Sequence, residues 1–254
     1  FIRKIIKRSF SKGGQYEIKD IKNSIDTHKS SMIFLHGLGD TGSGWLEQLS
    51  RIVPSHMKLI CPTAPIIPIS LFGYPTNAWF DIISFKKFDQ DDITGIKKSS
   101  QFLSYLIDKE HQSGIQLNKI LIGGFSQGGA IAYYTTLTSE IKFGGSLILS
   151  SWLANYMEFS QHPERWSRNS KIKMFIGHGG SDTLIFPEYM QKSVEILKRI
   201  GYNPNVHIYP DLEHSCSSAE ISDIMRFIQT IVDKKIRIIF MFTILNYIRY
   251  EFIG

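Results

Sequence analysis

Short apolar runs alternate with longer segments of helical periodicity along most of this chain. The runs predict strands near residues 32–35, 58–61, 120–123, 146–149, 173–176 and 206–209. Continuous apolar runs of this kind are typical of strands that are buried on both faces. Their alternation with helices indicates an α/β fold with a mostly parallel central sheet flanked by helices.

Between the runs, apolar residues recur three and four positions apart, which predicts helices with one face in the core. Such segments cover residues 93–107, the stretch after Pro187, and residues 218–232. The last is the most regular, and its apolar stripe consists of Ile221, Ile224, Met225, Ile228, Ile231 and Val232. We interpret these stripes as packing surfaces without chemical function.

Two segments, residues 62–77 and 151–170, are long for loops of a compact domain. The first contains four prolines, and the second contains Trp152 and Trp166. Long loops in compact domains are commonly lids or binding walls. We therefore expect both segments to border a functional site.

The length of the chain, 254 residues, suits one large domain, and nothing in its middle resembles a linker. We predict a single domain over residues 29–233, between a basic N-terminal extension, 1–28, and an apolar and basic C-terminal extension, 234–254. The formal net charge is +6, but most of the excess lies in residues 1–16 and the body is close to neutral. No nucleic-acid partner is therefore expected.

The two cysteines, Cys61 and Cys216, form neither a disulfide framework nor a metal-binding pair. This pattern favours a reducing compartment, and we predict a cytoplasmic protein without metal or cofactor. The apolar run 236–248 has only 13 residues and includes Arg237 and Asn246. It is too short to cross a hydrocarbon core of about 30 Å.

The first ten residues are basic, amphipathic and free of acids. One interpretation is a targeting or membrane-surface segment, which together with the apolar C-terminal run predicts peripheral membrane association. The other is a basic extension without a function of its own. The sequence leaves both interpretations open.

The strongest chemical signal is Gly124-Phe125-Ser126-Gln127-Gly128, which follows a predicted strand and precedes a helix-like stretch, residues 130–137. A serine nucleophile needs a sharp strand-to-helix turn, and small residues two positions before and after it let the backbone close that turn. An ordinary glycine-rich turn would give the same five letters. The flanking strand and helix patterns favour a nucleophile elbow with Ser126 as the nucleophile.

A serine hydroxyl needs a histidine base, and in this architecture the acid and then the histidine follow the serine along the chain. Of the late histidines, His207 lies inside a predicted strand, whereas His214 lies in the loop after it. His214 is therefore the predicted base.

Asp182 is the predicted acid because it follows the strand 173–176 on a glycine-rich turn. Asp211, three residues before His214, is the alternative acid. His178 is a candidate second base or metal ligand, but no carboxylate or cysteine stands at ligand spacing. We interpret it as a structural histidine that hydrogen-bonds its own loop.

The tetrahedral intermediate also needs backbone N–H donors for its oxyanion. One is expected from Gln127, the residue after the nucleophile, and the other from a loop that follows an early strand. Residues 36–42 form such a loop, and we assign the second donor to Leu38. The loop contains no phosphate-binding glycine motif.

Several consecutive motifs between about Ser31 and Val232 resemble the acyl-protein thioesterase and lysophospholipase family of serine hydrolases. The similar segments are residues 34–42, 60–65, 79–82, 123–130, 151–153 and 214–215. The resemblance implies an α/β-hydrolase with the triad Ser126, Asp182 and His214. Its implied substrates are long-chain thioesters of S-acylated proteins, with lysophospholipids or short esters as the alternative.

The resemblance also implies an acyl channel, with Leu71, Phe72, Tyr74 and Trp152 as wall candidates. Near the acid the sequence departs from the family pattern His-Gly-Asp-x-Asp-Pro-x-Val-Pro, since Gly180 and Thr183 replace an Asp and a Pro. A non-catalytic acyl-chain binder with a misplaced acid is therefore a further alternative.

Overall fold

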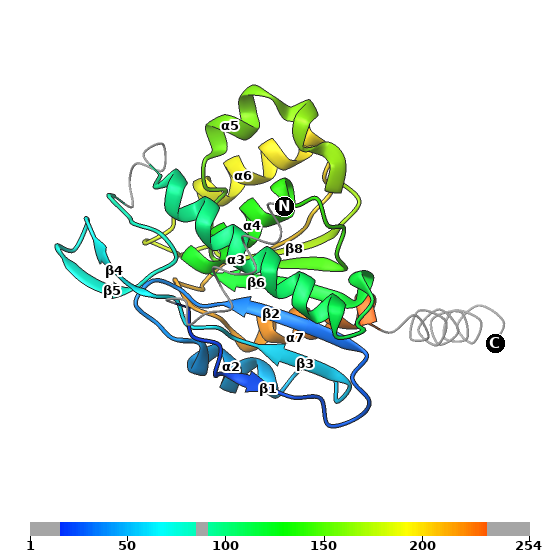
Figure 1. The fold of residues 1–254 in the computed structure, drawn as a ribbon. Helices are drawn as coiled ribbons and strands as arrows, with labels where there is room; N and C mark the ends of the chain where they lie inside the picture. The colour runs from blue at the N-terminus through cyan, green and yellow to red at the C-terminus, as the bar shows by residue number, and fades with distance from the viewer. Residues whose placement is uncertain (1–15, 85–90, 233–254) are drawn as a thin grey trace, which may run out of the picture.

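A seven-stranded sheet forms the centre of the computed structural model, which describes residues 16–84 and 91–232 (Figure 1). Its strand order is β1-β3-β2-β6-β7-β8-β9, and only the pair β1–β3 is antiparallel. The strands are β1 Ile21–Lys22, β2 Ser30–Leu35, β3 Met57–Ile60, β6 Ile120–Phe125, β7 Gly145–Leu149, β8 Lys173–Gly179 and β9 Asn205–Tyr209. All the predicted strands are present, which confirms the mostly parallel α/β architecture.

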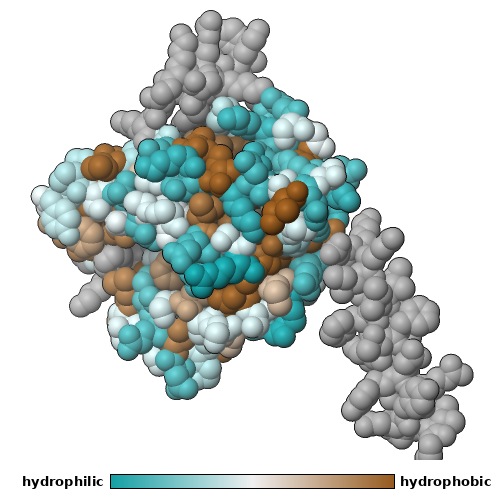
Figure 2. Space-filling view, turned by 90° about the horizontal axis from the view of Figure 1, so that it is seen from below, coloured by the Kyte–Doolittle hydropathy of each residue, from teal (hydrophilic) through white to brown (hydrophobic). Residues whose placement is uncertain are grey.

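Helices cover both faces of the sheet (Figure 1). One face carries α3 Ile93–Gln112, α4 Gln127–Thr138, α5 Tyr156–Gln161 and α6 Pro187–Ile200, and the other carries α2 Gly42–Ser50 and α7 Ser218–Val232. Short 3₁₀ turns lie at Leu117–Lys119 and Pro163–Asn169. Seen from the side of α2 and α7, hydrophobic side chains show between hydrophilic ones (Figure 2).

The two segments predicted as long loops contain regular structure. Residues 62–77 form a separate hairpin, with β4 Ile66–Ile69 antiparallel to β5 Tyr74–Asn77, and residues 151–170 contain α5 and a 3₁₀ turn. The sequence pattern did not predict this hairpin because each of its strands contains a proline, and the two, Pro68 and Pro75, lie opposite each other. Proline cannot donate to a ladder and is tolerated only at exposed strand edges.

Residues 16–28 pack against the sheet, so the folded body begins before the predicted boundary at residue 29. Tyr16 stacks on Phe102 with ring centroids 4.0 Å apart, Glu17 bridges to Thr63, and β1 pairs with β3. Two-residue strands are too short to leave a periodic signal. The remainder of the two predicted extensions, residues 1–15 and 234–254, lies outside the described residues, as does Asp233 at the end of the predicted domain.

A buried carboxylate ties the first strands to α3 at the amino ends of the strands. Glu110 accepts from Ser31 Oγ at 2.7 Å and from Lys58 Nζ at 2.7 Å. His28 Nε2 lies 3.7 Å from Glu110 Oε2, the oxygen that accepts from Ser31. Each oxygen of this 3% exposed residue therefore has a donor, as a buried charge requires.

Candidate active site

Ser126 occupies a sharp turn between β6 and α4. Its φ is 52° and its ψ is −119°, a strained conformation for a residue with a side chain. The turn is held because the Ser126 N–H donates to Leu149 O at 2.9 Å and its carbonyl accepts from Ser151 Oγ at 2.7 Å. The strand-turn-helix context expected of a nucleophile elbow is therefore present.

The two glycines of the motif are required by close backbone approach. A Cβ at Gly124 would lie 2.3 Å from the carbonyl carbon of Gly128, and a Cβ at Gly128 would lie 2.3 Å from Leu35 O. Both distances are far below contact distance. No side chain fits at either position while the serine stays in place.

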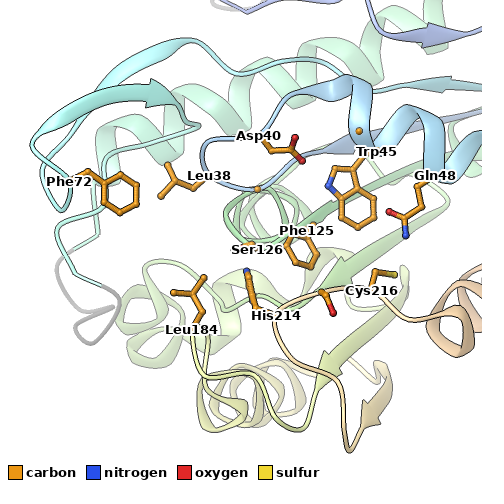
Figure 3. Close-up of a pocket in the computed structure, with 13 residues that line it drawn as sticks. Leu38, Asp40, Trp45, Gln48, Phe72, Phe125, Ser126, Leu184, His214 and Cys216 are labelled. Carbon is orange, nitrogen blue, oxygen red and sulfur yellow. The ribbon is translucent and has the colours of Figure 1, made fainter.

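The structure brings the predicted acid and base together. His214 Nδ1 lies 2.7 Å from Asp182 Oδ2, while Asp182 Oδ1 accepts the N–H groups of Leu184 and Ile185 at 2.9 and 2.8 Å. With its Nδ1 proton held by the carboxylate, the imidazole presents Nε2 as an acceptor. Figure 3 shows His214 facing Ser126.

Asp182 is 1% exposed, and burial alone would raise the pKa of its carboxyl. The hydrogen bond and charge of His214, with the N–H groups of Ile185 and Leu184, outweigh burial and hold the pKa below its ordinary value. The surrounding loop departs from the family pattern, but the Asp182 carboxylate is still ionised and still contacts the imidazole of His214.

The other histidine candidates have different surroundings. His178 is fully buried and donates from Nε2 to Ile185 O at 2.8 Å, which confirms its structural role in the loop. Burial lowers its pKa. His207 stacks on Phe175 with centroids 4.8 Å apart, and its Nδ1 lies 3.4 Å from Asp223.

The loop that carries Leu38 passes directly against the nucleophile. A Cβ at Gly37 would lie 3.5 Å from Ser126 Cβ, and Leu38 and Ser126 line the same pocket. His36, fully buried, fixes this loop because its Nδ1 donates to Gly37 O at 2.6 Å and its Nε2 accepts from Ala64 N at 3.0 Å. The position is suitable for the predicted oxyanion donor at Leu38.

Gln127, the other predicted donor, opens α4 immediately after the serine. Its side chain is fully buried: Oε1 accepts from Trp79 N at 2.9 Å and Nε2 donates to Phe80 O at 2.7 Å. These two bonds hold the start of the helix against the segment that follows the β4–β5 hairpin. No local sequence pattern indicates this second role.

An open pocket of about 660 Å³ surrounds the serine and the histidine (Figure 3). Beside Ser126, one end is apolar and the other end has polar groups. The apolar end is formed by Leu38, Phe72 and Leu184, and the other end by Asp40, Trp45, Gln48 and Cys216.

Only Phe72 of the predicted acyl-channel walls lines this pocket. Leu71 and Tyr74 lie beside it on the hairpin, 37% and 58% exposed, but do not line the cavity. Trp152 is 2% exposed and packs edge-on against Phe80 in the core, with centroids 6.2 Å apart. Trp152 therefore belongs to the core and not to the wall of this pocket.

Several lining residues were missed by the sequence analysis. They are Trp45 and Gln48 on α2, Leu184 in the acid loop, and Cys216 after the base. The helix α2 starts with Gly42 and contains Gly44, so its sequence does not indicate a helix. A Cβ at Gly42 would lie 1.8 Å from Cys61 O, which explains the glycine.

Among the residues that the structure describes, no three His, Cys, Asp or Glu side chains gather in a metal-binding group. Within the same residues, no helix has the length and hydropathy needed to cross a bilayer.

Comparison with known families agrees with this geometry. Residues 16–232 match the profile of the phospholipase/carboxylesterase family of α/β-hydrolases. The chain belongs to this family. It is 35% identical to the acyl-protein thioesterase 1 of Candida albicans over 81% of this chain and 94% of that protein. It is 36% identical to the acyl-protein thioesterase 1 of Gibberella zeae over 80% of this chain and 90% of that protein.

Solved structures of family members have the same fold. The acyl-protein thioesterase 2 of Zea mays superposes with a TM-score of 0.74 at 28% identity, over 84% of this chain and 97% of that one. Arabidopsis thaliana SOBER1 superposes with a TM-score of 0.74 at 26% identity, over 80% of this chain and 98% of that one. The α/β-hydrolase fold predicted for this family member is confirmed.

Proposed function

We propose that this α/β-hydrolase cleaves long-chain acyl thioesters from S-acylated proteins, with Ser126, Asp182 and His214 as its catalytic triad. The carrying observation is the 2.7 Å contact between His214 Nδ1 and Asp182 Oδ2 beside a strained serine in a partly apolar pocket. The names of its relatives support the thioester as substrate.

The mechanism begins when His214 Nε2 takes the proton of Ser126 Oγ, which attacks the thioester carbonyl. The negative oxygen accepts the N–H groups of Leu38 and Gln127. The carbon–sulfur bond then breaks, and the imidazolium returns its proton to the leaving thiolate. A water molecule, deprotonated by His214, releases the fatty acid from Ser126 by the same steps.

The apolar end of the pocket suits the acyl chain. Each methylene removed from water there stabilises the complex by about 0.8 kcal/mol. Leu38, Phe72 and Leu184 form this end, and the opposite end, near Asp40 and Gln48, is left for the protein that bears the acylated cysteine.

A second candidate function keeps the triad and changes the substrate to lysophospholipids or short carboxylic esters. It is favoured by the openness of the pocket and by the phospholipase/carboxylesterase family description. The specificity constants for a palmitoylated peptide, a lysophosphatidylcholine and a short nitrophenyl ester separate the two. The thioesterase proposal requires the palmitoylated peptide to have the largest value.

The triad is tested with Ser126→Ala and a matched control, Ser222→Ala, on the exposed side of α7. Ser126→Ala is expected to remove labelling by a fluorophosphonate probe and turnover of every acyl substrate, whereas Ser222→Ala keeps both. Labelling of Ser126→Ala at the wild-type rate would show that another residue is the nucleophile. A wild-type protein that binds palmitate but hydrolyses nothing would favour the acyl-chain binder.

We further propose that the enzyme is cytoplasmic and associates peripherally with membranes through its terminal sequences. The support is the basic, amphipathic start of the chain and the apolar run 236–248, both of which lie outside the described residues. Co-sedimentation with anionic vesicles should fall when both termini are deleted. Unchanged binding of the truncated protein would contradict this proposal.

A further inference from the structure

One buried carboxyl group lies behind the site without a part in the mechanism above. Glu220, in the first turn of α7, is fully buried, and neither of its side-chain oxygens has a hydrogen bond of ordinary geometry among the described residues. The donors near its carboxyl group are the Cys216 thiol and the Ser217 N–H. A Cβ at Gly177 would lie 2.0 Å from Glu220 Oε1. The carboxyl group therefore lies directly against the backbone of β8, in a space that only a glycine leaves open.

This space lies between the two segments that carry the acid and the base. Gly177 lies near the end of β8, which ends at Gly179, and Asp182 follows three positions after that end. On the other side, Ser217 Oγ accepts the Glu220 N–H at 3.1 Å and starts α7, only three positions after His214. The Glu220 side chain thus lies where the segment that leads to Asp182 and the segment that follows His214 come together.

The ionisable groups near Glu220 are Cys216 from the loop of His214, Asp223 on α7 and Tyr209 on β9. Strand β8 presents its backbone at Gly177. Asp223 accepts from the Tyr209 hydroxyl at 2.9 Å and lies beside His207 and Arg226. No cation of the described residues pairs with Glu220 itself.

A buried carboxylate without a cation is far more costly than the neutral acid. Burial accordingly raises the pKa of Glu220 to about 7, and the nearby Cys216 thiol and Ser217 N–H oppose this only in part. The thiol of Cys216 is weakly acidic in the same environment, because burial and Glu220 raise its pKa. The group beneath the two loops is therefore neutral in mildly acidic solution.

We propose that Glu220 is a positioning residue for Asp182 and His214, which holds the two loops in register as a neutral carboxyl group. When the proton is lost, the buried charge has to be hydrated, and the loops separate from β8 to admit water. The Asp182–His214 contact then weakens, and the main effect is a fall in kcat, because Glu220 itself does not line the pocket; KM changes less, through Leu184 and Cys216 of the two loops. This inference rests on the proposed triad.

The experiment measures kcat and KM from pH 6 to pH 8.5 with a nitrophenyl ester, so the result does not depend on the natural acyl substrate. The variants are Glu220→Gln, which is a permanently neutral amide of the same shape, and Glu220→Met, an apolar side chain of similar length. Glu195→Gln, on the exposed face of α6, is the control. The ratio of kcat for Glu220→Gln to kcat for wild type should rise about fivefold to tenfold between pH 6 and pH 8.

A ratio that stays constant with pH would overturn the proposal, because a purely structural defect lowers kcat equally at every pH. A change confined to KM would overturn it as well. Failure of both Glu220 variants to fold would show that the charged carboxylate is required, which also contradicts it. Failure of the triad itself is recognised separately, since Ser126→Ala would then retain activity with the same ester.

Discussion

Two glutamates are buried at opposite ends of the same sheet, and their surroundings differ completely. Glu110, at the amino ends of the strands, has Ser31 and Lys58 as donors, whereas Glu220, at the carboxyl ends, has no cation among the described residues and only the Cys216 thiol and the Ser217 N–H nearby. The first joins β2, β3 and α3 at little electrostatic cost. The second is tolerated beside the catalytic loops, where a titratable group has a functional consequence.

A third buried carboxylate, Asp182, has the proposed catalytic base His214 as its partner, and its substitution is expected to have the largest effect. Asp182→Asn is expected to lower kcat about 10³-fold to 10⁴-fold, because the amide favours the wrong imidazole tautomer. Steady-state kinetics with a palmitoylated peptide measures this loss. Asp211→Asn is the matched control, and an equal loss in that variant would reopen the choice of acid.

At the other end of the sheet, Lys58→Met leaves Glu110 as a buried charge with only hydroxyl and histidine neighbours. Breaking such a pair costs about 3 to 5 kcal/mol in the free energy of unfolding, while kcat should stay at the wild-type value. Urea denaturation measures the loss. The double variant Lys58→Met with Glu110→Gln should recover most of it, and a double variant as unstable as the single one would contradict the pairing.

Glu220→Gln, in contrast to Lys58→Met, should make the protein more stable than the wild type, and this advantage should grow as the pH rises. The pKa of Glu220 is raised from 4.5 to about 7, so between these values the folded state holds a proton that the unfolded state has lost. The stability of the wild type therefore falls with pH through this window and then levels off. The advantage of Glu220→Gln should grow by roughly 2 to 3 kcal/mol from pH 5 to pH 8.

Thermal unfolding of both proteins across this range measures the effect. Parallel curves for Glu220→Gln and wild type would mean that the carboxyl titrates alike in the folded and unfolded states. The same scan with Glu110→Gln provides the contrast, because removal of a paired carboxylate should destabilise the protein at pH 8.

The smallest effect is expected for His28→Ala. His28 Nε2 lies 3.7 Å from Glu110, and its side chain is 27% exposed. Solvent-exposed pairs contribute below about 1 kcal/mol to the free energy of unfolding. A loss as large as that of Lys58→Met would mean that His28 is needed as much as Lys58 to hold Glu110.

The parallel strands and the order of serine, acid and base could be predicted because each depends on local pattern. Continuous apolar runs mark β2, β3 and β6 to β9, and the elbow is encoded in five consecutive residues. The β4–β5 hairpin and α2 were not predictable in this way. Their prolines and glycines argue against regular structure and are explained only by contacts distant in sequence, such as Gly42 against Cys61.

The burial of Glu220 has the same origin. Ser217 and Glu220 have the spacing of a helix-capping pair, which normally lies at the surface. Nothing local indicates that the carboxyl group is enclosed, because the enclosing group is the backbone of Gly177. Trp152 is the opposite case. It was expected to line the acyl channel, but it is buried in the core.

The two hydrogen bonds of the Gln127 side chain have a mechanical consequence. They fasten the start of α4 to Trp79 and Phe80, just beyond the β4–β5 hairpin whose Phe72 lines the pocket. We propose the N–H of the same residue as an oxyanion donor. On that proposal, a substrate that displaces the segment after the hairpin also shifts the oxyanion donor, because the Gln127 side chain joins the two.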